Sequence, residues 1–213
     1  IADVTGPEQR GRGMALIGAA FGVGFTFGPL IGAWFVSDEL GGPPSAAPGY
    51  VAAGLSGLAL LSAIFLLKES LQSGCTPTAH HWFDRASLKQ AISQPLVGII
   101  LLTIFITVFS FAEFETTLSL LTLKMGFAPR NNFYIFAYVG LVLTIAQGGL
   151  VRRLLPRVGE FRMAAAGTIL TSLGLLLVGL SGQIDSTALC AVGITVCVVG
   201  MSAVSPSLQS MLS

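Results

Sequence analysis

Long apolar stretches alternate with shorter polar ones along the whole chain. Each apolar stretch is close to the length of about 20 residues that an α-helix needs to cross the hydrocarbon core of a bilayer. We therefore predict an all-α membrane protein with six transmembrane helices. They are expected at residues 13–36, 50–67, 95–118, 133–151, 163–180 and 187–210.

The longest polar stretch separates the second predicted helix from the third, at residues 68–94. Its residues 82–93 mix apolar with charged side chains, a pattern typical of a short helix that lies on the membrane surface. We expect the remaining polar stretches to be short loops, with a tight turn between the last two helices.

Composition supports a membrane protein and excludes other classes. Of the 213 residues, 53% are hydrophobic and 10% are charged, whereas soluble domains carry about 25% charged residues. The net charge of +1 and the lack of a basic stripe argue against a nucleic-acid partner. The chain starts at Ile1 without a methionine and ends inside an apolar stretch, so we expect a fragment of a longer protein.

The basic residues are divided unevenly between the two sides that six helices would define. One side holds nine of the 11 lysines and arginines, and the other holds only Lys124 and Arg130. The positive-inside rule places the richer side in the cytoplasm. The linker at 68–94 and the basic loop at 152–162 are therefore predicted to be cytoplasmic. The nine basic residues are Arg10, Arg12, Lys68, Arg85, Lys89, Arg152, Arg153, Arg157 and Arg162.

Glycines recur at a spacing of four in the first apolar stretch, and residues four apart share one face of a helix. A glycine face lets another helix approach closely, which is how helices commonly pack in lipid. Pro29 lies within this stretch and is expected to bend the helix there. The glycines are Gly18 and Gly22 in one series, and Gly24, Gly28 and Gly32 in another.

A segment rich in glycine and arginine follows the fourth predicted helix. Its glycines permit a tight turn, and its arginines can pair with helix C-terminal ends or with acids across an interface. The alternative is that the arginines only anchor this loop on the cytoplasmic side. The residues that define the segment are Gly148, Leu150, Arg153, Gly159 and Arg162.

The glycine-proline series from Gly24 to Gly32 resembles the motif on the fifth helix of major facilitator superfamily transporters, where it is most associated with proton-coupled drug exporters. The segment 148–162 resembles the signature loop of the same superfamily, in the form found between helices eight and nine. Ala33 replaces a second glycine of the first motif, and Arg152 stands where the second has an acid. The closest resemblance is to the tetracycline-resistance and multidrug-exporter branch.

This resemblance implies a place in a twelve-helix fold built from two six-helix halves. The six predicted helices would be family helices five to ten. Residues 1–67 would end the N-terminal half, residues 68–94 would link the halves, and residues 95–213 would supply the first four helices of the C-terminal half. The remaining helices of the full-length transporter would be partners of this chain.

Two acids follow the apolar run of residues 96–112 within the third predicted helix. If that helix extends to about Leu121, Glu113 and Glu115 lie at membrane depth, where an acid is costly and indicates a function. They are two residues apart, so at most one should face a central cavity. We favour Glu115 for a role in the proton or substrate pathway, because its surroundings resemble the FE-[ST]-T pattern of the exporter family. The alternative is a carboxylate in water at the outer interface.

Two glutamines and two cysteines also lie in predicted helices. Gln147 and Gln209 are able to hydrogen-bond a substrate, although such residues more often tie helices together. Cys190 and Cys197 are seven residues apart, and we expect free thiols. No metal site is expected, because the histidines at positions 80 and 81 lack a standard zinc spacing.

We expect a transporter and not an enzyme, because no nucleophile–base constellation is visible. The sequence lacks a GxxxxGK[ST] phosphate-binding loop, so we expect a proton gradient, without a cofactor, to drive transport. The resemblance implies export of small organic compounds or drugs by alternating access across a plasma or inner membrane. The alternatives are a proton-coupled uptake symporter and a non-transporting sensor or scaffold. A small organic substrate, protons and the lipid bilayer are the expected partners.

Overall fold

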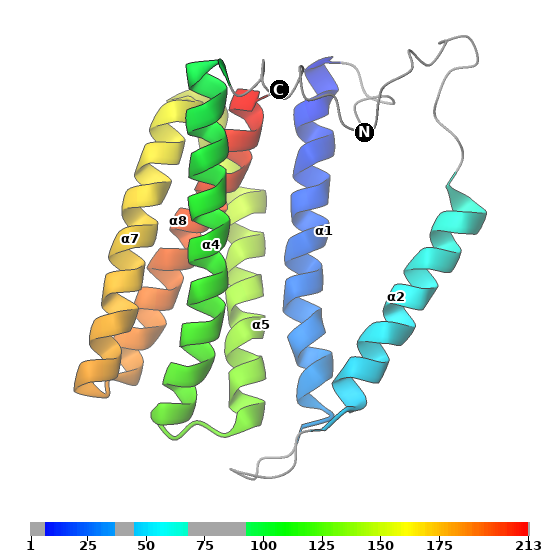
Figure 1. The fold of residues 1–213 in the computed structure, drawn as a ribbon, viewed down its shortest axis with the longest axis vertical. Coiled ribbons are helices and arrows are strands. Elements are labelled where there is room, and N and C mark those ends of the chain that lie inside the picture. Colours follow the sequence, from blue (N-terminus) through cyan, green and yellow to red (C-terminus); the bar gives the residue numbers. More distant parts are fainter. Residues whose placement is uncertain (1–6, 37–44, 68–92, 213) are drawn as a thin grey trace. The chain divides into compact units, whose positions relative to one another are not determined.

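The computed structural model describes residues 7–36, 45–67 and 93–212, which are almost entirely helical (Figure 1). No strand occurs among these residues. The fourth long helix passes without a break into a short π-helical segment and then a last α-helical piece. In chain order the elements are α1 (Pro7–Ala33), α2 (Ala47–Leu66), α4 (Pro95–Lys124), α5 (Pro129–Ile145), η1 (Ala146–Val151), α6 (Arg152–Val158), α7 (Glu160–Ile184) and α8 (Thr187–Leu212).

Five helical stretches are long and apolar enough to cross a membrane, and they agree with the second to sixth predicted helices. The first predicted helix, at 13–36, corresponds to α1, whose described apolar part, Ala20–Ala33, is shorter than a full span. The predicted surface helix at 82–93 lies, except for its last residue, outside the described residues. The all-α membrane fold is therefore confirmed. The five stretches are Ala47–Leu66, Val97–Lys124, Pro129–Leu155, Glu160–Ile184 and Thr187–Met211.

Several helix boundaries differ from the prediction. Helix α1 begins at Pro7 and ends at Ala33, rather than at residues 13 and 36. The third predicted helix does not stop at residue 118 but runs to Lys124. The predicted loop at 152–162 is wrong as a loop, because helix continues to Val158 and resumes at Glu160. Gly159 alone turns the chain, with φ at 87°. Glycine adopts a positive φ without steric cost, so one residue is enough for the turn.

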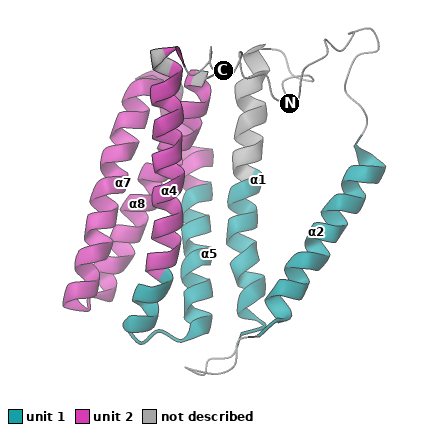
Figure 2. Cartoon of the chain, viewed as in Figure 1, with its two compact units in different colours: residues 1–70, 119–144 teal, residues 71–118, 145–213 magenta. Residues whose placement is uncertain are grey.

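The described helices belong to two compact units (Figure 2). Unit 1 contains α1, α2 and residues 119–144, which are the end of α4 and most of α5. Unit 2 contains α4 up to Leu118 and the chain from Ile145 onward.

In unit 1, helix α1 packs on α5 as an antiparallel pair. Along the pair, residue numbers on α1 increase while those of the residues they contact on α5 decrease. Each contact includes a glycine. A Cβ on Gly140 would come within 2.6 Å of the backbone of Phe25, so the two backbones nearly touch. The three contacts are Gly22 with Thr144, Phe25 with Gly140, and Gly32 with Phe133.

The glycines of α1 do not share one role. Gly22 and Gly32 lie against α5, but no heavy atom lies within 4 Å of the position that a Cβ would take on Gly24 or Gly28. Pro29 lies inside the helix, which continues to Ala33. Within unit 1, close packing therefore depends on Gly22, Gly32 and Gly140 rather than on the whole glycine-proline series.

Polar contacts hold the start of α5 in unit 1. Arg130 donates hydrogen bonds from Nε and Nη2 to the carbonyl oxygen of Val36, at 3.1 and 2.9 Å. Asn132 donates from Nδ2 to Ser119 Oγ at 2.7 Å, and its Oδ1 accepts a hydrogen bond from Thr122 Oγ1 at 3.1 Å. Arg130 thus joins the start of α5 to the residues that follow α1, and Asn132 stabilises the turn between α4 and α5.

In unit 2, helices α7 and α8 form an extensive pair. Each carries two glycines seven residues apart, a spacing of about two turns that keeps both on one face. A Cβ on Gly200 would lie 2.6 Å from the carbonyl oxygen of Gly167, and one on Gly193 would lie 2.8 Å from the backbone nitrogen of Val178. These glycines were not predicted as a packing face, although their spacing was visible. They are Gly167 and Gly174 on α7, and Gly193 and Gly200 on α8.

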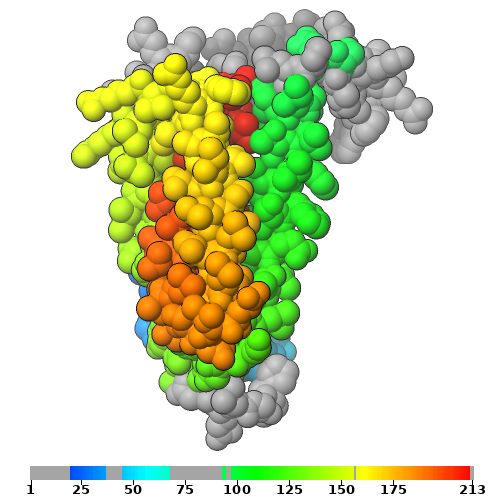
Figure 3. Space-filling model, turned by 90° about the vertical axis from the view of Figure 1, so that its left-hand side faces the viewer, coloured from blue at the N-terminus to red at the C-terminus, as the bar shows by residue number. Residues whose placement is uncertain are grey.

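Apolar side chains cover the outward surfaces of the helices. Helix α7, which lies at the centre of Figure 3, carries exposed Ile169, Leu176 and Ile184. Helix α2 has no buried residue in the described part of the chain. Exposed apolar surface of this extent suits contact with lipid or with further helices.

Candidate functional site

The two acids of α4 lie on different faces of the helix. Glu115 is half-buried and adjoins the buried line of Phe114 and Leu118, whereas Glu113 is exposed. Nine residues separate Glu115 from the end of the helix at Lys124, which is about 13 Å along the helix axis. A carboxyl group so far inside an apolar helix is costly to keep charged unless it meets water, a partner or a substrate.

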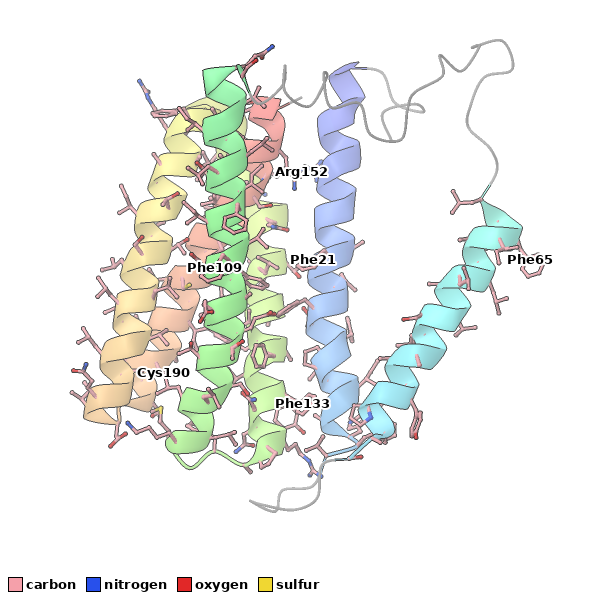
Figure 4. The ribbon with its side chains drawn as sticks, viewed as in Figure 1. Phe21, Phe65, Phe109, Phe133, Arg152 and Cys190 are labelled. Carbon is pink, nitrogen blue, oxygen red and sulfur yellow. The ribbon has the colours of Figure 1, made fainter. Side chains whose placement is uncertain are left out.

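Phenylalanines precede Glu115 on α4. Phe105 and Phe109 stack with ring centroids 6.3 Å apart (Phe109 is labelled in Figure 4), and Phe111 and Phe114 do so at 6.4 Å. Phe111 is four residues from Glu115 and shares its face. Phe111 therefore places an apolar ring on the helix face of the Glu115 carboxyl group, whereas Phe105 and Phe109 are exposed.

Gln147 lies in the π-helical segment η1 (Ala146–Val151). The backbone N–H of Arg152 donates a hydrogen bond to the carbonyl oxygen of Gln147, five residues earlier, which is the π-helical pattern. The next residues are Gly148 and Gly149, which weaken the α-helical alternative because glycine is a poor helix former. A Cβ on either glycine would have no heavy atom within 4 Å, so close packing does not require them. Their effect is on the backbone.

The two candidate glutamines have different surroundings. The side-chain oxygen Oε1 of Gln147 is buried and has no hydrogen-bond partner among the described residues. Its neighbours Ala146 and Val151 are also buried. Gln209, in contrast, is exposed on α8. Only Gln147 therefore has an unmet hydrogen-bonding requirement within unit 2.

The segment that resembles a signature loop is spread over three helical elements. Gly148 and Leu150 belong to η1, Arg153 to α6, and Arg162 to α7, while Gly159 forms the turn. Arg153 and Arg162 are both exposed. The glycine and arginine pattern identified the turn correctly, but it did not reveal how much of the segment is helical.

Glu160 makes a contact that was not predicted. It lies in the first turn of α7, where the helix dipole favours a negative charge. Its Oε1 accepts a hydrogen bond from Ser210 Oγ near the end of α8. This contact joins the start of α7 to the end of α8. No local signal could have shown it, since the partners are 50 residues apart.

Replacing Ser210 by alanine should lower the free energy of unfolding by about 1–3 kcal/mol, because the half-buried Glu160 carboxyl group loses a donor. Ser205→Ala is the matched control, since Ser205 is on the same helix but exposed. Thermal unfolding of the full-length protein in detergent measures both. Equal midpoints for the two variants would show that the contact does not stabilise the pair.

The cysteines of α8 are both free thiols and both buried (Cys190 is labelled in Figure 4). The Sγ atom of Cys197 lies 3.9 Å from Met201 Sδ. Both cysteines act as small apolar side chains in the α7–α8 pair. The histidines at 80 and 81 lie outside the described residues, and those described contain no group of three or more His, Cys, Asp or Glu that could hold a metal.

A family model described as the Major Facilitator Superfamily matches the chain over residues 1–213. Multidrug resistance protein 2 of Bacillus subtilis is 28% identical over 171 residues, which cover 76% of this chain and 40% of that protein. The class C tetracycline resistance protein of Escherichia coli is 27% identical, covering 100% of this chain and 52% of that protein. Major facilitator superfamily domain-containing protein 10 of Homo sapiens is 31% identical, covering 84% and 42%.

The chain thus spans about half the length of these relatives. No solved structure matches it.

Proposed function

The chain belongs to the Major Facilitator Superfamily, a family of membrane transporters rather than of enzymes, and on this premise we propose that it forms part of a proton-coupled exporter of small organic compounds. Two of the relatives above are named for multidrug and tetracycline resistance, which supports efflux of organic compounds. In this proposal the protein moves its substrate by alternating access, and the proton gradient supplies the driving force. No cofactor takes part.

The half-buried carboxyl group of Glu115 carries the proposal of proton coupling. It lies well inside an apolar span, where a permanent charge is costly. In the proposed cycle, Glu115 is ionised when it is open to one side of the membrane and protonated when it is open to the other. One proton would then move inward as the substrate moves outward.

The helix contacts support a mechanism in which packed helices shift against one another. The α1–α5 and α7–α8 pairs meet through glycines, so backbones approach without long side chains between them. In the proposed orientation, the arginines around Gly159 face the cytoplasm, and the Lys124 end of α4 faces the other side.

Inside-out membrane vesicles from cells that express the full-length protein test both the coupling and the direction. Respiration acidifies the interior of such vesicles. A proton-coupled exporter should then accumulate a lipophilic dye, about tenfold or more above vesicles without the protein, and a protonophore should abolish this accumulation. A symporter for uptake would instead move the dye outward. Dye accumulation that persists in the presence of the protonophore would contradict proton coupling.

A further inference from the structure

Gln147 Oε1 stands apart from the other polar groups of the described chain. It is the one buried side-chain nitrogen or oxygen atom without a hydrogen-bond partner among the described residues. Buried polar groups are nearly always hydrogen-bonded, because the loss of water is not otherwise offset. An unsatisfied acceptor of this kind therefore points to a donor that is absent from the described residues.

Buried hydroxyl groups of the same unit are satisfied within their own helices. Thr171 Oγ1 donates to the carbonyl oxygen of Gly167 at 2.9 Å, and Ser207 Oγ donates to that of Ala203 at 2.7 Å. These residues need no outside partner. The amide oxygen of Gln147 can only accept a hydrogen bond, so its missing partner must carry an N–H or O–H group.

The backbone around Gln147 gives a second, independent indication. Gln147 lies in the π-helical segment, and such segments account for well under 1% of residues and are frequent at functional sites. The glycines at 148 and 149 leave open space where side chains would stand. A rare backbone geometry at a buried, unsatisfied acceptor is the combination expected where a small molecule binds.

The surroundings of Gln147 also limit the charge of the ligand. Ala146 and Val151 are buried apolar neighbours, and Arg152 and Arg153 follow on the same helix. The buried apolar neighbours disfavour any ion, because a charge taken out of water without a partner is costly. The matching donor is therefore an uncharged hydroxyl or amide group.

We propose that Gln147 binds the transported compound by accepting a hydrogen bond from an uncharged hydroxyl or amide group, and thereby selects substrates that carry such a group. This inference rests on the proposed export function. Gln147 lies five residues before Arg152, toward the basic end of its helix. In the proposed orientation it would meet the compound as it enters from the cytoplasm.

Chloramphenicol and its derivative that is acetylated at both hydroxyl groups and methylated at the amide nitrogen form a suitable probe pair, because these changes remove every O–H and N–H donor. Uptake of each into inside-out vesicles should be measured for the full-length wild type and for Gln147→Met, which keeps the length of the side chain but removes the acceptor. We expect the wild type to prefer chloramphenicol by about tenfold, the scale of one hydrogen bond. Gln147→Met should reduce this preference to near unity.

Gln209→Met is the matched control, because Gln209 is exposed on α8, and it should keep the wild-type preference. Three results would overturn the inference: no preference in the wild type, a preference that survives Gln147→Met, or an equal loss of transport of both compounds together with a lower unfolding midpoint. The last result would show that Gln147 bonds another helix. Failure of the wild type to move any compound in a proton-dependent way would instead contradict the proposed function itself.

Discussion

Replacing Gly174 by leucine should destabilise the protein by about 3 kcal/mol, the upper end of the usual cost of overpacking. A Cβ at this position would meet the backbone nitrogen, Cα and Cβ of Cys197 on α8. Backbone atoms cannot move aside as a flexible side chain does. The helices α7 and α8 would have to separate, and the close contact along their length would be lost.

Gly179→Leu provides the matched control on the same helix. Gly179 is exposed, and a Cβ there would have no heavy atom within 4 Å. This variant should unfold at a temperature close to that of the wild type, because a leucine that faces lipid is acceptable. Thermal unfolding of the full-length protein in detergent would measure both variants. Equal midpoints for Gly174→Leu and Gly179→Leu would contradict the close packing of α7 on α8.

The Glu115→Gln variant should lose concentrative transport by a factor of about 100 or more, the scale expected when a group that transfers protons is removed. Glutamine has nearly the same size and still forms hydrogen bonds, but it cannot exchange a proton. Downhill exchange of labelled substrate should survive, because it needs no net proton movement. Dye accumulation and downhill exchange in inside-out vesicles would measure the two activities separately.

Glu113→Gln makes the same chemical change two residues away, on the exposed face of α4. It should keep concentrative transport within about twofold of the wild type, because surface substitutions away from a site have small effects. Equal losses in Glu113→Gln and Glu115→Gln would contradict the assignment of the proton to Glu115. Full transport in both variants would show that neither acid takes part in the mechanism.

Apolar patterning predicted most of the fold. A run of about 20 apolar residues has few stable forms in lipid other than a transmembrane helix, so the second to sixth helices were found from composition and length. Their ends were less well predicted. Segment 152–162 is polar and contains Pro156 and Gly159, yet Gly159 is the one turn residue. Helix α6 continues past the apolar stretch, which periodicity alone did not show.

Close contacts between helices were harder to predict than the helices. The spacing of Gly24, Gly28 and Gly32 is regular, but only Gly32 of this series lies against α5. Which glycine of a face meets a partner depends on the crossing of two helices, and one sequence does not reveal that crossing. Gly140 meets the backbone of Phe25 but belongs to no glycine series, and the seven-residue spacing of Gly167 and Gly174 was visible but was not predicted to be a packing face.

The candidate site was predicted by residue type but not by geometry. Glu115 was singled out because acids are rare at membrane depth, and its half-buried position next to Phe114 came from the structure. Gln147 was one of two similar glutamines in the sequence. The π-helical backbone and the buried, unsatisfied Oε1 distinguish it from Gln209. Such a backbone depends on small local differences in hydrogen bonding, which residue preferences do not resolve.

Proton movement coupled to substrate is the most direct test of the central proposal. The full-length protein would be reconstituted in liposomes that hold a pH-sensitive dye, and substrate would be added on one side. The wild type and Glu113→Gln should move protons opposite to the substrate, and Glu115→Gln should move substrate downhill without protons. A wild type that carries substrate with no accompanying proton movement would contradict the proposal of proton-coupled export.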